Sequence, residues 1–385
     1  MNKKTGHVFV WPIGTRIIHW MMALSFATAF ITSFYEHLLH DHVALGFIFL
    51  IIIVYRLIWG VIGPRYATFN TFKLSLPQLK HYFVEKIQNR WRKIPAGHNP
   101  ASSWFTVWAL GVGSVIVVSG LLLYGVQEGK GLFRDLNGTH SQYMGILTMV
   151  HKYSSYLFLA WVVIHILGVM VEQFWHKTGM VFAMVTGYKK TEGEDTKVKP
   201  WLAVFAYMMI FIAIGTYFFI VSSNYNFLTL RKYTNIDYEE MHPVYYSNCA
   251  DDCHKIYPPF LLPEKSWKRI IDDMDNHFGE EITEANISLS QQASIREFLY
   301  ENAAEHSTRE VAVKTMKSLG DLRPKAITKT AYWRATHKNI PRSAYRDKKI
   351  KDKSNCWNCH KDFEDGVLSD MNIIYKGPFQ KPVSR

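Results

Sequence analysis

Five apolar runs shape the first part of the chain, and none follows them. The runs cover residues 17–35, 43–62, 104–125, 146–171 and 201–221. Each has about the 20 residues that a helix needs to cross a hydrocarbon core of about 30 Å. Residues 223–385 contain no run of that length. The pattern predicts an integral membrane protein with five spans, followed by a domain outside the membrane.

Basic residues orient these spans. The stretch between the second and third runs holds seven Lys or Arg residues, including Arg65, Lys73 and Arg92. The stretch between the first and second runs holds Glu36 and Asp41 but no Lys or Arg. By the positive-inside rule the N-terminus is cytoplasmic, and five spans place the C-terminal domain in the periplasm of a bacterial inner membrane. The first run is longer than the apolar core of a cleaved signal peptide, so we expect it to remain as an anchor.

The formal net charge of +12 follows from this topology. Up to residue 222 the chain has 19 Lys and Arg against 9 Asp and Glu, and beyond it 25 against 23. The excess is therefore no argument for nucleic-acid binding, and the nearly neutral outer domain gives no strong electrostatic indication of its partner. The charged stretch at residues 189–199 is expected to be a solvated cytoplasmic loop that binds no ligand.

Histidines within the spans are the first candidate site. Ionisable residues in a membrane are costly and usually mark a working site. His19 lies in the first run, His42 opens the second, and the fourth holds His151 and His165. Fourteen residues at 100° each return His165 to within about 40° of the face of His151. Depth then pairs His151 with His42 on the outer side and His165 with His19 near the cytoplasm, which predicts two haem b groups with two imidazole ligands each.

Neighbouring residues bear on this prediction. Gly46, four residues after His42, leaves space for a porphyrin beside the helix. Arg56 could pair with a haem propionate or extend to lipid phosphate. His37 and His40 are rival outer ligands, although they fall in the connecting turn. Hydrogen bonding between helices is the alternative role for all of these histidines.

All four cysteines lie in two cysteine-histidine signatures in the last third of the chain. These are Cys249-Ala-Asp-Asp-Cys253-His254 and Cys356-Trp-Asn-Cys359-His360. In C-x-x-C-H, two thiols attach a haem c covalently and the adjacent His binds the iron. The second signature fits this pattern, and the first carries one extra residue between its cysteines. Disulfides or a zinc site would not need a His after each pair, so the signatures predict two haems c.

The membrane part resembles a known family. Residues 10–190 are similar to the bacterial cytochrome b561 family, which includes the cytochrome b subunits of nickel-iron hydrogenases. The resemblance lies in Thr-Arg-Ile-Ile-His19-Trp, His42-Val-Ala-Leu-Gly46, Arg56-Leu-Ile-Trp-Gly, and His151 with His165. It implies a four-helix bundle with two bis-His haems that exchanges electrons with membrane quinone. No residue is assigned to a quinone site.

The outer part resembles a second family. Residues 240–375 are similar to the dihaem cytochromes c known as DHC, in Cys253-His254-Lys-Ile-Tyr-Pro-Pro, Leu-Leu-Pro-Glu-Lys-Ser-Trp267, Asp-Asn-His277-Phe-Gly279 and Asn-Cys356-Trp-Asn-Cys359-His360. The resemblance implies bis-His ligation and favours His277 and His337 as distal ligands. Chain order suggests His277 for the haem on Cys249 and Cys253. Other options for the distal positions are His242, His306, Met274 and Met316.

Two helices are expected in this part. Apolar residues recur at helical spacing from Trp267 through Ile270, Ile271 and Met274 to Phe278, with His277 at the edge of the stripe. A second helix is predicted at about residues 290–303.

Together these features predict an all-α chain. A transmembrane four-helix di-haem b bundle in residues 1–190 leads through a loop end and a fifth, tethering helix in 191–225 to a mainly α-helical di-haem cytochrome c domain in 226–385. Irons with two protein ligands have no open position for a substrate, which favours electron transfer.

The partners follow from this prediction. They are membrane lipid, quinone, a periplasmic redox protein and further complex subunits, without nucleic acid. Electrons would pass outward from menaquinol or ubiquinol, as in a component of a quinol:cytochrome oxidoreductase, or in the reverse direction. The alternative is a gas-binding or sensing protein with a five-coordinate haem c.

Overall fold

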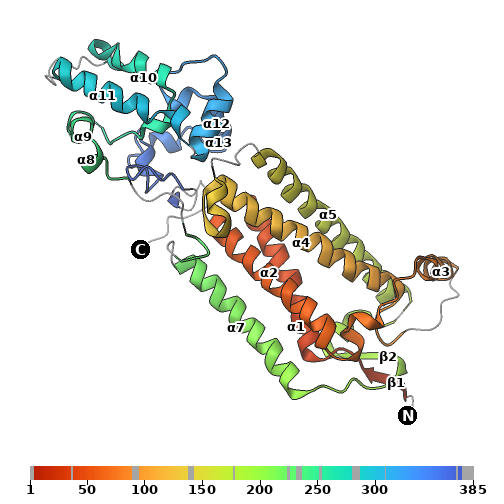
Figure 1. Cartoon of the computed structure of the whole chain (residues 1–385). Coiled ribbons are helices and arrows are strands. Elements are labelled where there is room, and N and C mark those ends of the chain that lie inside the picture. The colour runs from red at the N-terminus through yellow and green to blue at the C-terminus, as the bar shows by residue number, and fades with distance from the viewer. Residues whose placement is uncertain are drawn as a thin grey trace. The chain divides into compact units, whose positions relative to one another are not determined.

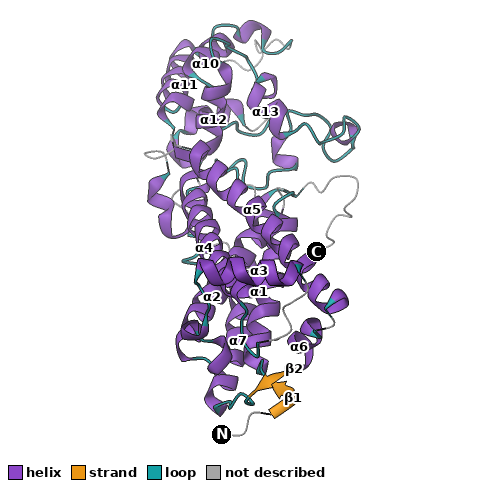
Figure 2. Ribbon diagram, turned by 90° about the vertical axis from the view of Figure 1, so that its right-hand side faces the viewer, coloured by secondary structure: helices purple, strands orange, loops and turns teal. Residues whose placement is uncertain are grey.

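The computed structural model describes residues 4–35, 38–88, 95–137, 143–176, 178–222, 226–230, 236–250, 254–279, 287–307, 309–369 and 372–374. It divides into two compact units. The first comprises residues 1–35, 40–120 and 146–224, and the second residues 36–39, 121–145 and 225–385. Helices dominate both units, as the fold class predicted (Figure 2).

The first unit consists mainly of long helices (Figure 1). They are α1 (Ile13–Thr32), α2 (Leu39–Ile62), α3 (Leu76–Ile87), α4 (Pro100–Glu128), α5 (Met144–Met170), α6 (Met180–Thr186) and α7 (Pro200–Ser222). Short 3-10 helices η2 (Arg65–Ala67) and η3 (Phe69–Thr71) follow α2, and a π-helical turn, η6 (Val171–Trp175), extends α5. The unit boundary crosses α4 after residue 120 and α5 before residue 146.

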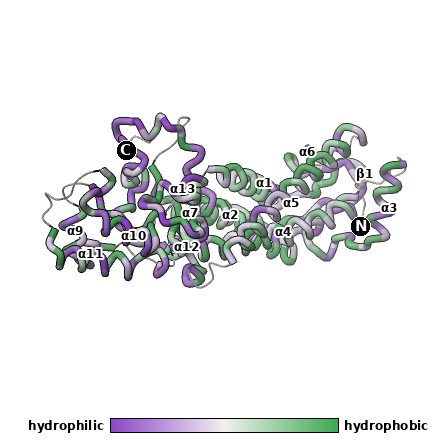
Figure 3. Tube along the Cα trace, turned by 90° about the horizontal axis from the view of Figure 1, so that it is seen from above, coloured by the Kyte–Doolittle hydropathy of each residue, from purple (hydrophilic) through white to green (hydrophobic). Residues whose placement is uncertain are grey.

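Four of these helices are long and apolar enough to cross a membrane. They are α2, α4, α5 with its π-helical turn, and α7. The helices α1, α2, α4 and α5 are largely green in the hydropathy colouring of Figure 3. The first predicted run also forms a helix, α1, but it does not reach the same hydropathy, because Arg16 and His19 interrupt its apolar sequence.

Helix α7 is part of the packed unit as well as a connection. Ala206 and Met209 of α7 are fully buried in a cluster that includes Ile18 of α1 and Trp59 of α2. Gly14 makes this packing close, because a Cβ at that position would lie 2.5 Å from the Trp59 ring. The absence of a side chain at Gly14 therefore lets α1 approach its neighbours.

A two-stranded antiparallel sheet replaces part of the loop expected at residues 189–199. Strand β1 (Lys4–Phe9) pairs with β2 (Tyr188–Gly193), with Phe9 opposite Tyr188. The Lys189 side chain is buried and donates a hydrogen bond to the Pro95 carbonyl oxygen at 2.6 Å. Burial lowers the pKa of Lys189 to about 8. The expectation of a loop is wrong for residues 189–193, which form a strand with residues from the start of the chain, whereas Lys197 and Lys199 lie outside the strand and are exposed as expected.

Short helices make up the second unit. They are α8 (Tyr238–Met241), α9 (Pro243–Cys249), η7 (Pro259–Leu261), α10 (Glu264–Ile271), η8 (Met274–Asn276), α11 (Leu289–Glu301), η10 (Ala304–His306), α12 (Glu310–Leu319), η11 (Ile327–Lys329), α13 (Ala331–Thr336), η12 (Ala344–Arg346) and η13 (Cys356–Asn358), with η4 (Gly131–Leu136) after α4. Their core includes Trp267, Ile270, Ile295, Phe298 and Leu299.

One of the two helices expected in this part is confirmed and the other is shorter than predicted. Helix α11 coincides with the expected helix at about 290–303 and buries the apolar residues on one face. Helix α10 ends at Ile271, however, and Phe278 is 59% exposed with a positive φ of 59°. The acidic pair Asp272–Asp273 follows directly, and Asp favours turns over helix interiors. The apolar stripe therefore stops before His277.

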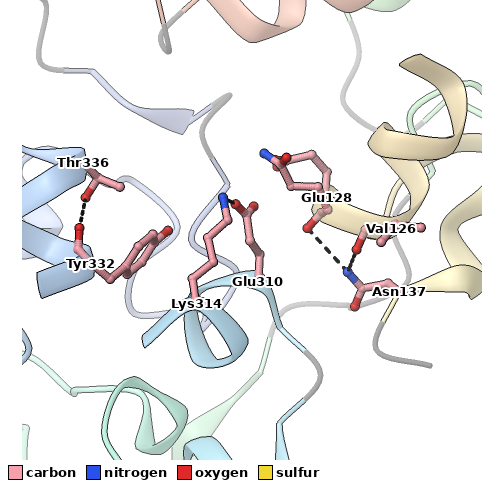
Figure 4. Close-up of polar contacts among 8 residues, drawn as sticks. Val126, Glu128, Asn137, Glu310, Lys314, Tyr332 and Thr336 are labelled. Atoms are coloured by element: carbon pink, nitrogen blue, oxygen red, sulfur yellow. Dashed lines mark hydrogen bonds and ion pairs between the residues drawn. The ribbon is translucent and has the colours of Figure 1, made fainter. Parts of the chain in front are cut away.

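Side-chain contacts hold the helix ends of this unit. The Asn137 amide donates to the Val126 carbonyl oxygen at 2.8 Å, and Lys314 pairs with Glu310 (Figure 4). The Thr336 hydroxyl donates to the Tyr332 carbonyl oxygen at 3.2 Å in α13. The last of these contacts lies in the turn of α13 that precedes His337.

Candidate cofactor-binding sites

Two pairs of histidines meet inside the first unit. The ring centroids of His19 in α1 and His165 in α5 are 6.4 Å apart. Those of His42 in α2 and His151 in α5 are 6.1 Å apart. The structure thus brings together the pairs that depth along the spans predicted.

The ring nitrogens of these pairs are arranged for binding a metal ion. Nδ1 of His42 lies 2.8 Å from the Ala29 carbonyl oxygen, and Nδ1 of His151 lies 3.0 Å from that of Ile116. A neutral imidazole that donates from Nδ1 keeps a lone pair on Nε2, which is the usual arrangement of a metal-binding His. In the other pair, the buried Nδ1 of His19 has no hydrogen-bond partner.

The spacing fits a metal ion between the rings. A metal to imidazole nitrogen bond is about 2 Å long, so two rings on opposite sides of one ion have centroids about 6 Å apart. Among the described residues no hydrogen bond joins the two rings of either pair. A hydrogen bond would need nitrogen atoms within about 3.2 Å, closer than the distance of about 4 Å that separates two ligands on opposite sides of one ion.

Glycines leave room beside the outer pair. A Cβ at Gly46 in α2 would meet no atom within 4 Å, which is compatible with the space that the sequence predicted there for a porphyrin. A Cβ at Gly120 in α4 would lie 2.9 Å from Cε1 of His151. The absence of a side chain at Gly120 therefore lets the ring of His151 approach α4. Helix α4 also contributes Phe105, which stacks on the ring of His165 at 4.4 Å.

Arg56 lies buried near the end of α2. Its side chain is 9% exposed, and its guanidinium carbon sits 5.2 Å from the Phe69 ring centroid. The Nη1 atom has no hydrogen-bond partner. A buried cation without a partner is costly, so this position suits an anionic group. A lipid phosphate could not be reached without exposure, which favours the propionate of the two roles expected for Arg56.

The rival outer ligands are less well placed. His42 makes the ring contact with His151, and His40 lies two residues earlier in α2. His37 lies outside the described residues.

Two further pairs lie in the second unit. His254 and His277 have ring centroids 6.4 Å apart and nearly parallel planes, at 18°. His337 and His360 have centroids 6.2 Å apart. His277 thus faces the His of the first signature, as chain order suggested, and His337 faces that of the second.

Backbone carbonyl oxygens hold two of these four rings, as they hold His42 and His151 in the first unit. Nδ1 of His254 lies 2.8 Å from the Lys255 carbonyl oxygen, and Nδ1 of His337 lies 2.9 Å from that of Trp333. The buried Nδ1 atoms of His277 and His360 have no hydrogen-bond partner. Burial lowers the pKa of His277 and His337, and it lowers that of His360 to about 4. Burial thus favours the neutral form of His277, His337 and His360, which is the form that binds a metal ion.

Cys356 and Cys359 of the second signature form no disulfide, so both sulfur atoms are available for the attachment of a haem. Within the described ranges, no three His, Cys, Asp or Glu side chains are gathered as a metal ion such as zinc would require. Cys249 ends α9, and Cys253 lies outside the described residues.

The other candidate distal ligands lie outside the two histidine pairs. Nδ1 of His242 accepts a hydrogen bond from the Tyr245 backbone N–H at 2.9 Å, which caps α9, and its Nε2 lies 3.2 Å from the Ser294 hydroxyl oxygen. Both of its nitrogens therefore have partners. His306 is exposed, and Met274 and Met316 pack against the apolar core.

One buried polar cluster was not predicted. Glu172, in the π-helical turn after α5, forms a 2.7 Å ion pair with Lys86 of α3 and accepts a hydrogen bond from the Tyr82 hydroxyl at 3.2 Å. The Asn99 amide donates to the same hydroxyl at 3.0 Å. The signal for it in the sequence was an acidic residue directly after the fourth apolar run.

Comparisons with known proteins match both parts of the chain. The family model "Prokaryotic cytochrome b561" matches residues 10–187, and the model "Dihaem cytochrome c" matches residues 245–368. These matches confirm both resemblances, the haem b and haem c cofactors, and a multi-pass membrane protein that transfers electrons through haem.

Individual proteins are similar to one or the other part of the chain. A "Probable Ni/Fe-hydrogenase B-type cytochrome subunit" of Rhodobacter capsulatus is 22% identical over 220 residues, which cover 49% of this chain and 83% of the relative. A "Diheme cytochrome c from Rhodobacter sphaeroides" is a solved structure with 29% identity and a TM-score of 0.28, over 32% of this chain and 94% of its own. A diheme cytochrome c from Shewanella baltica OS155 has 28% identity and a TM-score of 0.28, over 36% and 93%.

The hydrogen bonds of His242 distinguish it from His277 as a candidate distal ligand, and this difference can be tested. We expect His242→Gln to keep both haems c in their wild-type spectra, because this ring already uses both nitrogens within the protein. The matched change His277→Gln should leave one haem c high-spin. Visible and electron paramagnetic resonance spectra of the two purified variants check this, and a high-spin haem in His242→Gln would show that the wrong histidine was chosen.

Proposed function

We propose that this chain carries electrons between membrane quinone and a periplasmic redox protein. The chain belongs to the prokaryotic cytochrome b561 family in residues 10–187 and to the dihaem cytochrome c family in residues 245–368. The observation that carries the proposal is the set of four facing histidine pairs, two in each family region. The haems, when bound, supply one-electron centres with potentials set by their ligands and surroundings.

In the membrane domain, the proposed ligands are His19 with His165 and His42 with His151. The backbone carbonyls of Ala29 and Ile116 orient the rings of the second pair. Since three helices supply the four ligands, and α5 supplies one to each pair, α5 fixes the separation of the two sites along the bundle. This arrangement supports electron passage between the two faces of the membrane.

Two other residues are assigned to the same sites. Gly46 leaves the space that a porphyrin needs beside α2. Arg56 offers a buried positive charge to a propionate, which would otherwise be an uncompensated anion in an apolar setting.

The outer domain attaches its cofactors through the two signatures. Cys249 and Cys253 would hold one haem c, with His254 and His277 as ligands. Cys356 and Cys359 would hold the other, with His360 and His337 as ligands. The parallel rings of the first pair and the capped helix end beside His337 hold these ligands in place.

Each of the eight rings has a partner ring at a similar separation, between 6.1 and 6.4 Å. If both rings of each pair bind the iron, no position would be left open for a gas, which favours electron relay over the alternative of gas binding at a five-coordinate haem c. We propose no catalytic residue that acts on a bound substrate.

The proposed topology follows from the charge of the loops. A membrane domain in residues 1–190 has its N-terminus in the cytoplasm, residues 191–225 lead back through the membrane, and residues 226–385 lie in the periplasm of the bacterial inner membrane. The name of the Rhodobacter capsulatus relative, a subunit, supports further complex subunits as partners. The preferred direction is outward from menaquinol or ubiquinol.

Quinol-driven reduction tests this proposal. In membranes that contain the full chain, added menaquinol or ubiquinol should reduce haem b first and haem c afterwards, as followed at their separate absorption bands. Dithionite gives the full extent of reduction as a reference. If neither quinol reduces any haem c that dithionite reduces, the outward direction is wrong. Oxidation of prereduced haem c by added quinone would then demonstrate the reverse direction.

Gly46 offers a direct test of the membrane site. Gly46→Leu should leave the fold intact, because a Cβ there meets no atom within 4 Å, but the new side chain would occupy the porphyrin's space. We expect it to lower the haem b content from two to about one per chain in a pyridine haemochrome assay. Gly111→Leu, on the exposed face of α4, is the matched control and should retain both. Full haem b content in Gly46→Leu would remove Gly46 from the site.

A further inference from the structure

The near neutrality of the outer domain conceals a strong segregation of charge. Residues 226–322 contain 10 Lys and Arg against 17 Asp and Glu. Residues 323–361 contain 12 against 2. The second stretch, which we call the basic segment, includes His337 and the whole second cysteine signature. The net charge of the outer domain is therefore a poor guide to its surface, and the distribution of the charges does indicate a partner.

The basic segment contains both His337 and His360, and basic residues are their neighbours in the chain. Lys338 follows one ligand and Lys361 follows the other, and both side chains are exposed. Arg334, also exposed, lies on α13 one turn before His337. Positive side chains thus flank both ligands in the sequence and in the folded domain.

A loop of the same segment is fastened to the cysteine signature. The Ile350 carbonyl oxygen accepts hydrogen bonds from the Asn355 and Asn358 side-chain amides, at 2.9 and 3.3 Å. The rings of Trp333 and Tyr345 are also in contact, with centroids 6.1 Å apart. These contacts hold the lysines near Ile350 beside the haem attachment site.

Most of these positive charges face solvent without acidic partners. Ten of them are exposed, namely Lys329, Arg334, Lys338, Arg342, Arg346, Lys348, Lys349, Lys351, Lys353 and Lys361. Among the described residues, one salt bridge involves the basic segment, and it joins Lys325 to Asp273.

The two acidic residues of the segment accept hydrogen bonds from its own backbone. Asp347 accepts a hydrogen bond from the Lys349 N–H at 2.8 Å, and Asp352 accepts one from the Ser354 N–H at the same distance. They build turns and leave the positive charge of the surface largely uncompensated.

We propose that the basic segment is the docking surface for an acidic redox protein, and that the site of His337 and His360 is where electrons are exchanged with it. This inference rests on the proposed function, since it names the partner of the outer end of that electron path. A surface of one sign steers an oppositely charged partner and raises association rates by about 10 to 1,000 fold. A redox protein is favoured over anionic lipid because the charges surround a haem site, where an electron acceptor must come close.

Charge reversal tests the proposal on the full-length protein in nanodiscs of neutral phosphatidylcholine. The variant is Lys348→Glu with Lys349→Glu, and the matched control is Lys265→Glu with Lys317→Glu, which changes the net charge equally on exposed residues outside the segment. Each protein is reduced with dithionite, so quinol plays no part in the measurement. Stopped-flow absorbance then follows oxidation of haem c by plastocyanin, an acidic copper protein, and by a strongly basic cytochrome c.

At an ionic strength of about 0.01 M, where charges act over about 30 Å, we expect the variant to react about tenfold more slowly with plastocyanin than the wild type does. The control should stay within about twofold of the wild type, and the basic cytochrome should not be slowed by the reversal. The wild-type rate with plastocyanin should fall as salt is raised.

Two results would overturn the proposal. One is an equal effect of the segment variant and the control, which would mean that net charge alone matters. The other is an effect of the reversal that appears only in nanodiscs of anionic phosphatidylglycerol, which would assign the segment to the membrane surface. Because the haems are reduced chemically, neither result depends on whether quinol is the natural donor.

Discussion

The separation of facing imidazole rings is the constraint on which the rest of this structure depends. Four pairs of rings lie 6.1 to 6.4 Å apart, two in a unit of mainly long helices and two in a unit of short helices. This distance is too long for a hydrogen bond between ligand nitrogens and suits one metal ion between them. Backbone carbonyl oxygens hold Nδ1 of four of these rings, in His42, His151, His254 and His337, which leaves Nε2 of each for a metal ion.

Much of the membrane site could be predicted because helices in a bilayer have simple geometry. The spacing of fourteen residues between His151 and His165 and the depth of His19 and His42 sufficed to name both pairs. Arg56 was ambiguous from the sequence, and its burial favours one of the two roles. The pairing of His277 with His254 also followed chain order, although only the structure shows the two rings side by side.

Other features depend on contacts between residues far apart in the chain. The charged stretch at 189–193 looks like a loop until its pairing with residues 4–9 is seen. The helix expected to reach Phe278 ends at Ile271, because local turn preferences of Asp outweigh the apolar spacing. The role of Gly120 requires the neighbouring helix, and the roles of His242 require Ser294. The overall charge of the outer domain concealed its segregation, because the average removes the positions of the charges.

The central claim is that all eight histidines close four irons. The spectrum of the dithionite-reduced, full-length protein under carbon monoxide tests this most directly, because carbon monoxide binds ferrous haem only at an open axial position. The account predicts no change in the Soret and visible bands of either haem type. A shift in the bands of haem c or haem b would reveal a five-coordinate iron and contradict the paired ligation.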